Sequence, residues 1–188
     1  MRLSSKQVML DLETLDTVPG GVILSVGACA FDVENGVDEE DTFYMVVSRH
    51  SSEWAGLTVN ADTLTWWEKQ SPEARKVLTE AREGGYPLAY VLGCLAGWLQ
   101  SHGNPPVWTN GPGFDEAFLA VAARRIDVPA PIPFRKSRCF RTLRAMFGDD
   151  VVEPMTTVGV HHNALSDAIY QAQYAVSIFR YLSPSDSK

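Results

Sequence analysis

The chain has 188 residues, 45% of them hydrophobic and 21% charged, a composition that excludes a largely disordered protein and allows a full core. Its formal net charge of −7 disfavours a protein that binds nucleic acid mainly through a basic surface. No apolar run approaches the ~20 residues of a membrane span, and the first apolar stretch already contains Asp11, which argues against a signal peptide. We expect a single domain over residues 1–188, with flexible tails at 1–6 and 183–188.

The amino-terminal part has the composition of three strands. Residues Gln7–Leu12 are apolar, and Val22–Asp32 is rich in branched and small residues. An Asn35-Gly36 turn signal precedes Asp41–Val47, where strand composition resumes. These segments predict an antiparallel three-strand meander.

The rest of the chain alternates helical and extended patterns. We expect helices over Ala61–Lys69, from Pro72, from Pro87, over Phe114–Ile126 and around Leu165–Phe179, a short buried strand over Val107–Asn110, and a short strand and helix within 137–147. Strands followed by alternating helices and strands indicate an α/β domain with a mixed central sheet.

Two carboxylates follow the first apolar strand at Asp11 and Glu13. Side chains alternate along a strand, so both point to the same face. Two adjacent carboxylates repel each other unless a cation lies between them. The alternative is a strand end that emerges into water.

Two further segments carry acids. Asn110-Gly111-Pro112-Gly113-Phe114-Asp115 joins a short strand to a helix, where Asp115 has the alternative interpretation of an ordinary N-cap. Asn163 is a candidate cap of the last helix, with His162 before it and Asp167 in its early turns. The alternatives there are a loop histidine and a solvated aspartate.

Together, the DxE, Nx₃FD and Hx₄D patterns resemble the DEDD exonucleases of the histidine branch (DEDDh; the DnaQ-like and RNase T-like enzymes). The order and rough separations match from about residue 7 to 181. Four stretches are similar to a narrower group of bacterial and phage exoribonucleases related to mycobacterial RNase AS: MLDLETLDTVPGGVILSVGACAFD, LTVNADTLTWWEKQSPEAR, RCFRTLRAMF and HHNALSDAIYQAQY.

The resemblance implies an RNase H-like exonuclease fold and a two-metal site. Asp11, Glu13, Asp115 and Asp167 would hold two Mg²⁺ or Mn²⁺ ions, which prefer carboxylate oxygen. His162 would be the general base, and the adjacent His161 a spectator. Asp16 departs from the glycine or asparagine expected there in many relatives. The favoured interpretation is a harmless surface acid, and the alternative is an acid that perturbs the entry to the site.

Several residues are predicted to contact the substrate. The set is Thr14, Leu15, Trp66, Trp67, Asn110, Phe114 and Arg141. By resemblance, the backbone and side chains of Thr14 and Leu15 meet the terminal nucleotide. Adjacent helical residues point about 100° apart, so one tryptophan can pack inward while the other faces the bases. The alternative is that both belong to the core.

A basic segment at 135–144 is the candidate phosphate-binding patch. Arg141 and Arg144 share a face if the segment is helical, and the alternative is a solvated face.

The expected activity is metal-dependent 3′→5′ hydrolysis of single-stranded ends, releasing nucleoside 5′-monophosphates, with RNA as the preferred substrate. The alternatives are a DNA exonuclease and a catalytically silent nucleic-acid-binding module.

We expect a cytoplasmic protein of a bacterial or phage-infected cell, with no membrane partner and with homodimer formation by resemblance. Three cysteines without close spacing suit a reducing compartment and predict no zinc site.

Overall fold

The computed structural model describes residues 6–111, 113–151 and 159–183, and the side chains of 148–151 are outside this description. The expected tails therefore lie almost wholly outside the described residues. Within these residues no helix is long and apolar enough to cross a membrane.

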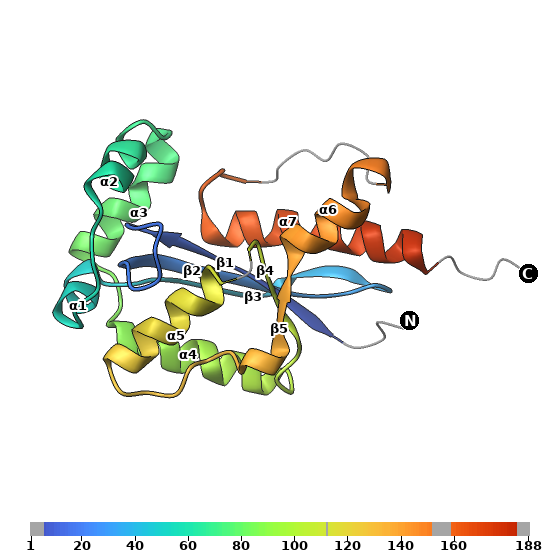
Figure 1. The fold of residues 1–188 in the computed structure, drawn as a ribbon, viewed down its shortest axis with the longest axis horizontal. Helices are drawn as coiled ribbons and strands as arrows, with labels where there is room; N and C mark the ends of the chain where they lie inside the picture. The colour runs from blue at the N-terminus through green and yellow to red at the C-terminus, as the bar shows by residue number, and fades with distance from the viewer. Residues whose placement is uncertain (1–5, 112, 152–158, 184–188) are drawn as a thin grey trace, which may run out of the picture.

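A five-stranded sheet in the order β3-β2-β1-β4-β5 forms the centre of the fold (Figure 1). Its strands are β1 (Gln7–Thr14), β2 (Ile23–Asp32), β3 (Gly36–Val46), β4 (Val107–Thr109) and β5 (Ser137–Cys139). β1, β2 and β3 pair antiparallel, whereas β4 lies parallel to both β1 and β5. The predicted meander and the mixed sheet are confirmed.

The helices are α1 (Arg49–Trp54), α2 (Ala61–Glu68), α3 (Pro72–Glu83), α4 (Leu88–Ser101), α5 (Asp115–Arg125), α6 (Phe140–Val151) and α7 (Ala164–Leu182), with a 3-10 turn at Phe134–Lys136. Ser71 caps α3 by accepting a hydrogen bond from the Ala74 amide, and Pro72 is its first residue. This start matches the prediction, because both signals are local in the chain.

The sheet separates two hydrophobic cores. Val8, Leu10 and Leu12 of β1 pack into the larger core with residues of α4 and α5. Met9 faces the other side, where it packs with Trp108 and the apolar face of α7. Because side chains alternate along β1, Asp11 and Glu13 stand on the side of the sheet that α7 covers.

Two local features differ from the sequence expectation. β3 begins at Gly36 rather than Asp41, and its register with β2 shifts between Cys29 and Ala30. The added residues of β3 include exposed acids, which lack the apolar alternation that marks a strand. α1 was not expected because it is a short helix whose single buried residue is Ser52.

A close approach of α7 to β2 positions the start of that helix. A Cβ atom on Gly27 would overlap the backbone of Ala164 and Leu165. Gly27 is also the register partner of Asp11 on the neighbouring strand. The missing side chain therefore lets the first turn of α7 rest directly on the sheet beside Asp11.

Candidate active site

Three carboxylates meet where β1 passes under the first turns of α7. Carboxylate oxygens of Asp11, Glu13 and Asp167 lie within 4.8 Å of one another. The predicted shared face of Asp11 and Glu13 is thus present, and it is directed into the protein rather than into water. Asp167 is also drawn into this group, with 16% of its side chain exposed, so it does not lie on a solvated helix face.

Asp115 is the fourth carboxylate and is 2% exposed. It is the first residue of α5, and the N-cap position belongs to Phe114, so the interpretation of Asp115 as an ordinary cap is wrong. Hydrogen bonds from the backbone of Leu12 and Asn110 favour its ionised form. Its charge acts on both Asp11 and Glu13, which places it in the same electrostatic cluster.

Glu116 is an additional acid that the sequence analysis did not single out. Its carboxylate accepts hydrogen bonds from the Gly113 amide (3.1 Å) and the Thr109 hydroxyl (3.1 Å). These bonds brace the turn between β4 and α5 that carries Asp115. An acid three residues after a glycine turn was the available signal, but it also fits an ordinary first-turn glutamate.

Burial and mutual repulsion oppose ionisation of this cluster. Burial, followed by the charges of Asp115 and Glu13, raises the pKa of Asp11 well above its usual range. Burial, then Asp167 and Asp115, raises the pKa of Glu13 to about 8. Burial also raises the pKa of Asp115 to about 7. A divalent cation would offset both effects, and carboxylate oxygens are the ligands that Mg²⁺ and Mn²⁺ prefer.

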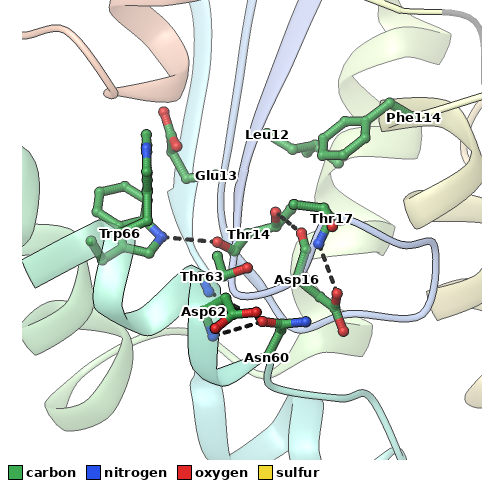
Figure 2. A pocket seen from close by; sticks show the side chains of 11 residues that line it. Leu12, Glu13, Thr14, Asp16, Thr17, Asn60, Asp62, Thr63, Trp66 and Phe114 are labelled. Atoms are coloured by element: carbon green, nitrogen blue, oxygen red, sulfur yellow. Dashed lines mark hydrogen bonds between the residues drawn. The ribbon is translucent and has the colours of Figure 1, made fainter.

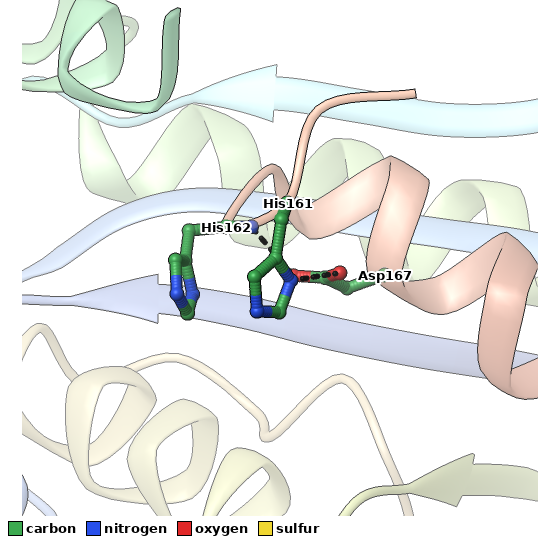
Figure 3. A group of neighbouring side chains, drawn as sticks. All are labelled: His161, His162 and Asp167. Carbon is green, nitrogen blue, oxygen red and sulfur yellow. Dashed lines mark hydrogen bonds and ion pairs between the residues drawn. The ribbon is translucent and has the colours of Figure 1, made fainter. Parts of the chain in front are cut away.

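A histidine pair lies beside Asp167 just before α7 (Figure 3). The His162 amide donates to Asp167 Oδ2 at 3.1 Å, and the His161 Nδ1 atom lies 3.4 Å from Asp167 Oδ1. The two imidazole rings stack with centroids 3.9 Å apart. His162 has a φ of 62°, and Asn163 caps the helix by accepting from the Ser166 amide. This turn brings both histidines, not His162 alone, to the carboxylates.

The two tryptophans of α2 take different positions. Trp67 is 1% exposed and donates its Nε1 hydrogen to the Thr14 carbonyl at 3.0 Å. Trp66 is 42% exposed, and its ring meets His162 edge-on with centroids 4.8 Å apart. The expected division into one inward and one outward ring is present, and Trp67 also supports the end of β1.

A pocket of about 430 Å³ opens next to Glu13. Figure 2 shows that its walls come from the end of β1, the start of α2 and Phe114. Its lining residues are Leu12, Glu13, Thr14, Asp16, Thr17, Asn60, Asp62, Thr63, Trp66, Trp67 and Phe114. The wall formed by residues 60–63 was not predicted from the sequence, where its one local signal is the Asn60 cap of α2.

These observations describe a cluster of buried carboxylates, of the kind that binds divalent cations, beside a pocket of about 430 Å³. A family model described as the 3′-5′ exoribonuclease Rv2179c-like domain matches residues 6–179. The chain belongs to this family. It is a 3′→5′ exonuclease, as the motifs predicted, with an RNase H-like fold.

Solved exonuclease structures share the fold. The nuclease domain of 3′hExo, a DEDDh family member bound to rAMP, is 14% identical with a TM-score of 0.65, over 94% of this chain and 92% of that one. S. pombe Pop2p in a Mg²⁺- and Mn²⁺-bound form is 17% identical with a TM-score of 0.63, over 96% and 86%. E. coli Exonuclease I in complex with an oligonucleotide is 14% identical with a TM-score of 0.62, over 96% of this chain but 41% of that one. No curated protein matches the chain.

Asp16 has a structural place in the exonuclease. It is buried, and its Oδ2 atom accepts a hydrogen bond from the Thr58 hydroxyl at 2.8 Å. Its Oδ1 atom accepts from the amides of Thr17 and Val18, which closes the turn after β1. The interpretation of Asp16 as a surface acid is therefore wrong: it ties the pocket wall to the segment before α2.

Not every predicted contact residue reaches the pocket. Leu15 is fully buried in the larger core, and its backbone groups pair with Val22 and Asn60. Leu15 therefore does not line the pocket beside Glu13. Asn110 instead supports the Asp115 carboxylate through its backbone.

The two arginines of the basic segment point to different surroundings. The Arg141 guanidinium lies 3.3 Å from the place of a Cβ on Gly111, at the turn that leads to Asp115. Arg144 lies over the Tyr174 ring, 5.1 Å from its centroid. Of these two arginines, only Arg141 lies against the turn that leads to Asp115.

Proposed function

We propose that the exonuclease is metal-dependent and that it removes nucleoside 5′-monophosphates from the 3′ end of single-stranded RNA. The main support is that carboxylate oxygens of Asp11, Glu13 and Asp167 lie within 4.8 Å of one another. The charge of the buried Asp115 also acts on Asp11 and Glu13. These residues would hold two Mg²⁺ or Mn²⁺ ions. When bound, such ions stabilise the attacking and leaving oxygens of a phosphodiester displacement.

His162 is proposed as the general base for the attacking water. Burial, and then the neighbouring His161, lower the pKa of His162, which favours the neutral ring at pH 7. A neutral imidazole can accept a proton, whereas an imidazolium cannot. The bond from the His162 amide to Asp167 fixes the turn that carries the ring.

The pocket beside Glu13 is proposed to receive the terminal nucleoside. Leu12 and Phe114 supply apolar walls, and the exposed face of Trp66 offers a stacking surface. Thr14 lines the same pocket, and the Trp67 Nε1 atom donates a hydrogen bond to the Thr14 carbonyl. Arg141 lies at the turn that leads to Asp115 and forms no ion pair among the described residues. We propose that it contacts a backbone phosphate of the substrate.

RNA is the proposed substrate because the matching family is described as exoribonucleases. The experiment is an end-labelled degradation assay with RNA, single-stranded DNA and duplexes, each with Mg²⁺, Mn²⁺ or chelator. We expect shortening of single-stranded RNA from its 3′ end with either metal, and a severe loss of this activity in Asp11→Ala, because the variant lacks a proposed metal ligand.

The matched control is Glu39→Ala, which removes an exposed acid of β3 and should leave activity unchanged. Degradation that persists in chelator or in Asp11→Ala would refute the metal mechanism. Faster hydrolysis of DNA than of RNA would identify DNA, and not RNA, as the preferred substrate. Binding without hydrolysis in the presence of metal would support the silent binding module.

A further inference from the structure

One polar side chain of α7 contacts the carboxylate cluster without being an acid or a histidine. Gln171 is 5% exposed, and its Nε2 atom donates a hydrogen bond to Asp11 Oδ1 at 2.9 Å. Its Oε1 atom is buried and has no hydrogen-bond partner among the described residues. The contact joins positions 160 residues apart in the sequence.

The surroundings of Gln171 on α7 are apolar. It lies within the buried face of α7, where Ala168, Ala172 and Ala175 are fully buried. Burying an amide in such an apolar setting costs free energy unless it is hydrogen-bonded. Its one direct partner in the described structure is Asp11, so that bond is the interaction that offsets the cost.

The neutral amide suits its position for an electrostatic reason. Asp11 lies among Glu13, Asp115 and Asp167, so another carboxylate at position 171 would add to their repulsion. A lysine or arginine would place a fixed positive charge where a cation is expected. An amide donor can orient Asp11 without either effect, and it engages only Oδ1.

We propose that Gln171 is a positioning residue of the exonuclease, which holds Asp11 in the orientation that binds a divalent cation. The inference rests on the proposed metal-dependent function and goes beyond it by naming a residue outside the four acids and the histidine. Residues that orient ligands in this way typically contribute 10- to 100-fold to metal affinity or activity.

The test measures Mn²⁺ binding directly, by the electron paramagnetic resonance signal of the free ion, with no nucleic acid present. Gln171→Met keeps the length and volume of the side chain but removes its donor. We expect it to bind Mn²⁺ about 10- to 100-fold more weakly than the unaltered protein. Its exonuclease rate should recover as Mn²⁺ is raised, which loss of the fold would not permit.

Gln173→Met is the matched control, because it makes the same change two residues along α7, at a half-buried position away from the cluster. Gln171→Asn is a second variant that keeps a polar amide for folding but withdraws it from Asp11, and it too should weaken Mn²⁺ binding. Folding of each variant is followed by thermal unfolding in chelator.

Three outcomes would overturn the inference. They are a folded Gln171→Met or Gln171→Asn protein with unchanged Mn²⁺ affinity, equal weakening in Gln173→Met, and an activity defect that raised Mn²⁺ does not relieve. Absence of Mn²⁺ binding by the unaltered protein would refute the metal site itself. Mn²⁺ binding without degradation of any strand would refute the proposed activity, while the affinities of the variants would still decide the role of Gln171.

Discussion

Glu13 and Asp115 are buried acids whose ionisation is opposed by their surroundings. Burial is the largest cause at both positions and raises the pKa of Glu13 to about 8 and that of Asp115 to about 7. In an unfolded chain the same groups ionise at a pH of about 4. Folding without metal is therefore coupled to proton uptake by these groups, and a bound cation competes with those protons.

We expect the metal-free protein to become less stable as pH rises from about 4 to about 8. A carboxyl group with a raised folded-state pKa stabilises the fold fully below its unfolded pKa and loses that contribution as pH passes through the folded pKa. Mn²⁺ should consequently raise Tm more at high pH than at low pH.

Thermal unfolding in chelator and in Mn²⁺, across this pH range, checks the expectation. Glu13→Gln removes one of the titrating groups and should flatten the pH dependence in chelator. The exposed-acid variant Glu39→Ala is the control. A Tm in chelator that increases steadily over the range would contradict the linkage.

At the scale of elements, the site depends on how closely α7 crosses the sheet. Gly27 leaves room for the backbone of Ala164, and this contact places Asp167 and Gln171 above Asp11. The same helix start carries the histidine turn. The Asp167 carboxylate, the Gln171 amide and the two histidines therefore all depend on this contact between α7 and β2.

Gly27→Ala should move α7 away from β2, because the added Cβ would overlap backbone atoms that cannot rotate aside. We expect a destabilisation of about 1–3 kcal/mol and weaker Mn²⁺ binding. Gly93→Ala is the control: it lies within α4, and its added Cβ would meet no described atom within 4 Å. Chemical denaturation and Mn²⁺ titration measure both effects. An unaltered Mn²⁺ affinity in Gly27→Ala would show that α7 is not positioned through this contact.

At the scale of the whole molecule, a protein with a net charge of −7 has to accept a polyanion. The acidic cluster itself would repel phosphates unless cations were bound. Arg141 and Arg144 are both exposed, but Arg141 lies at the turn leading to Asp115, whereas the guanidinium of Arg144 lies over Tyr174. In the proposed mechanism, bound metal ions and the Arg141 side chain would counter this repulsion locally.

Arg141→Ala should weaken binding of single-stranded RNA and reduce the slope of log affinity against log salt by about 0.7, the value for one phosphate contact on a single strand. Arg144→Ala should change the slope less. Fluorescence anisotropy at several salt concentrations, with Ca²⁺ in place of Mg²⁺ to slow hydrolysis, measures both. Equal slopes for Arg141→Ala and the unaltered protein would exclude this phosphate contact.

Features that depend on neighbouring residues in the chain could be predicted from the sequence alone. Strand alternation placed Asp11 and Glu13 on one face, Pro72 and the candidate cap Asn163 marked two helix starts, and the adjacent tryptophans took different faces of α2. The order of the motifs predicted the family as well. The strand, cap and tryptophan signals each act within a few residues, and motif order is read along the chain, so no knowledge of packing is needed to interpret them.

The tertiary structure alone decided which distant groups meet. Burial of Asp16 against Thr58, exclusion of Leu15 from the pocket and the bond from Gln171 to Asp11 all depend on where loops and helices cross the sheet. Residue type alone does not reveal these crossings, because a glutamine can be either buried or exposed to solvent. The sequence by itself determined the acids of the site, and packing determined how they are held.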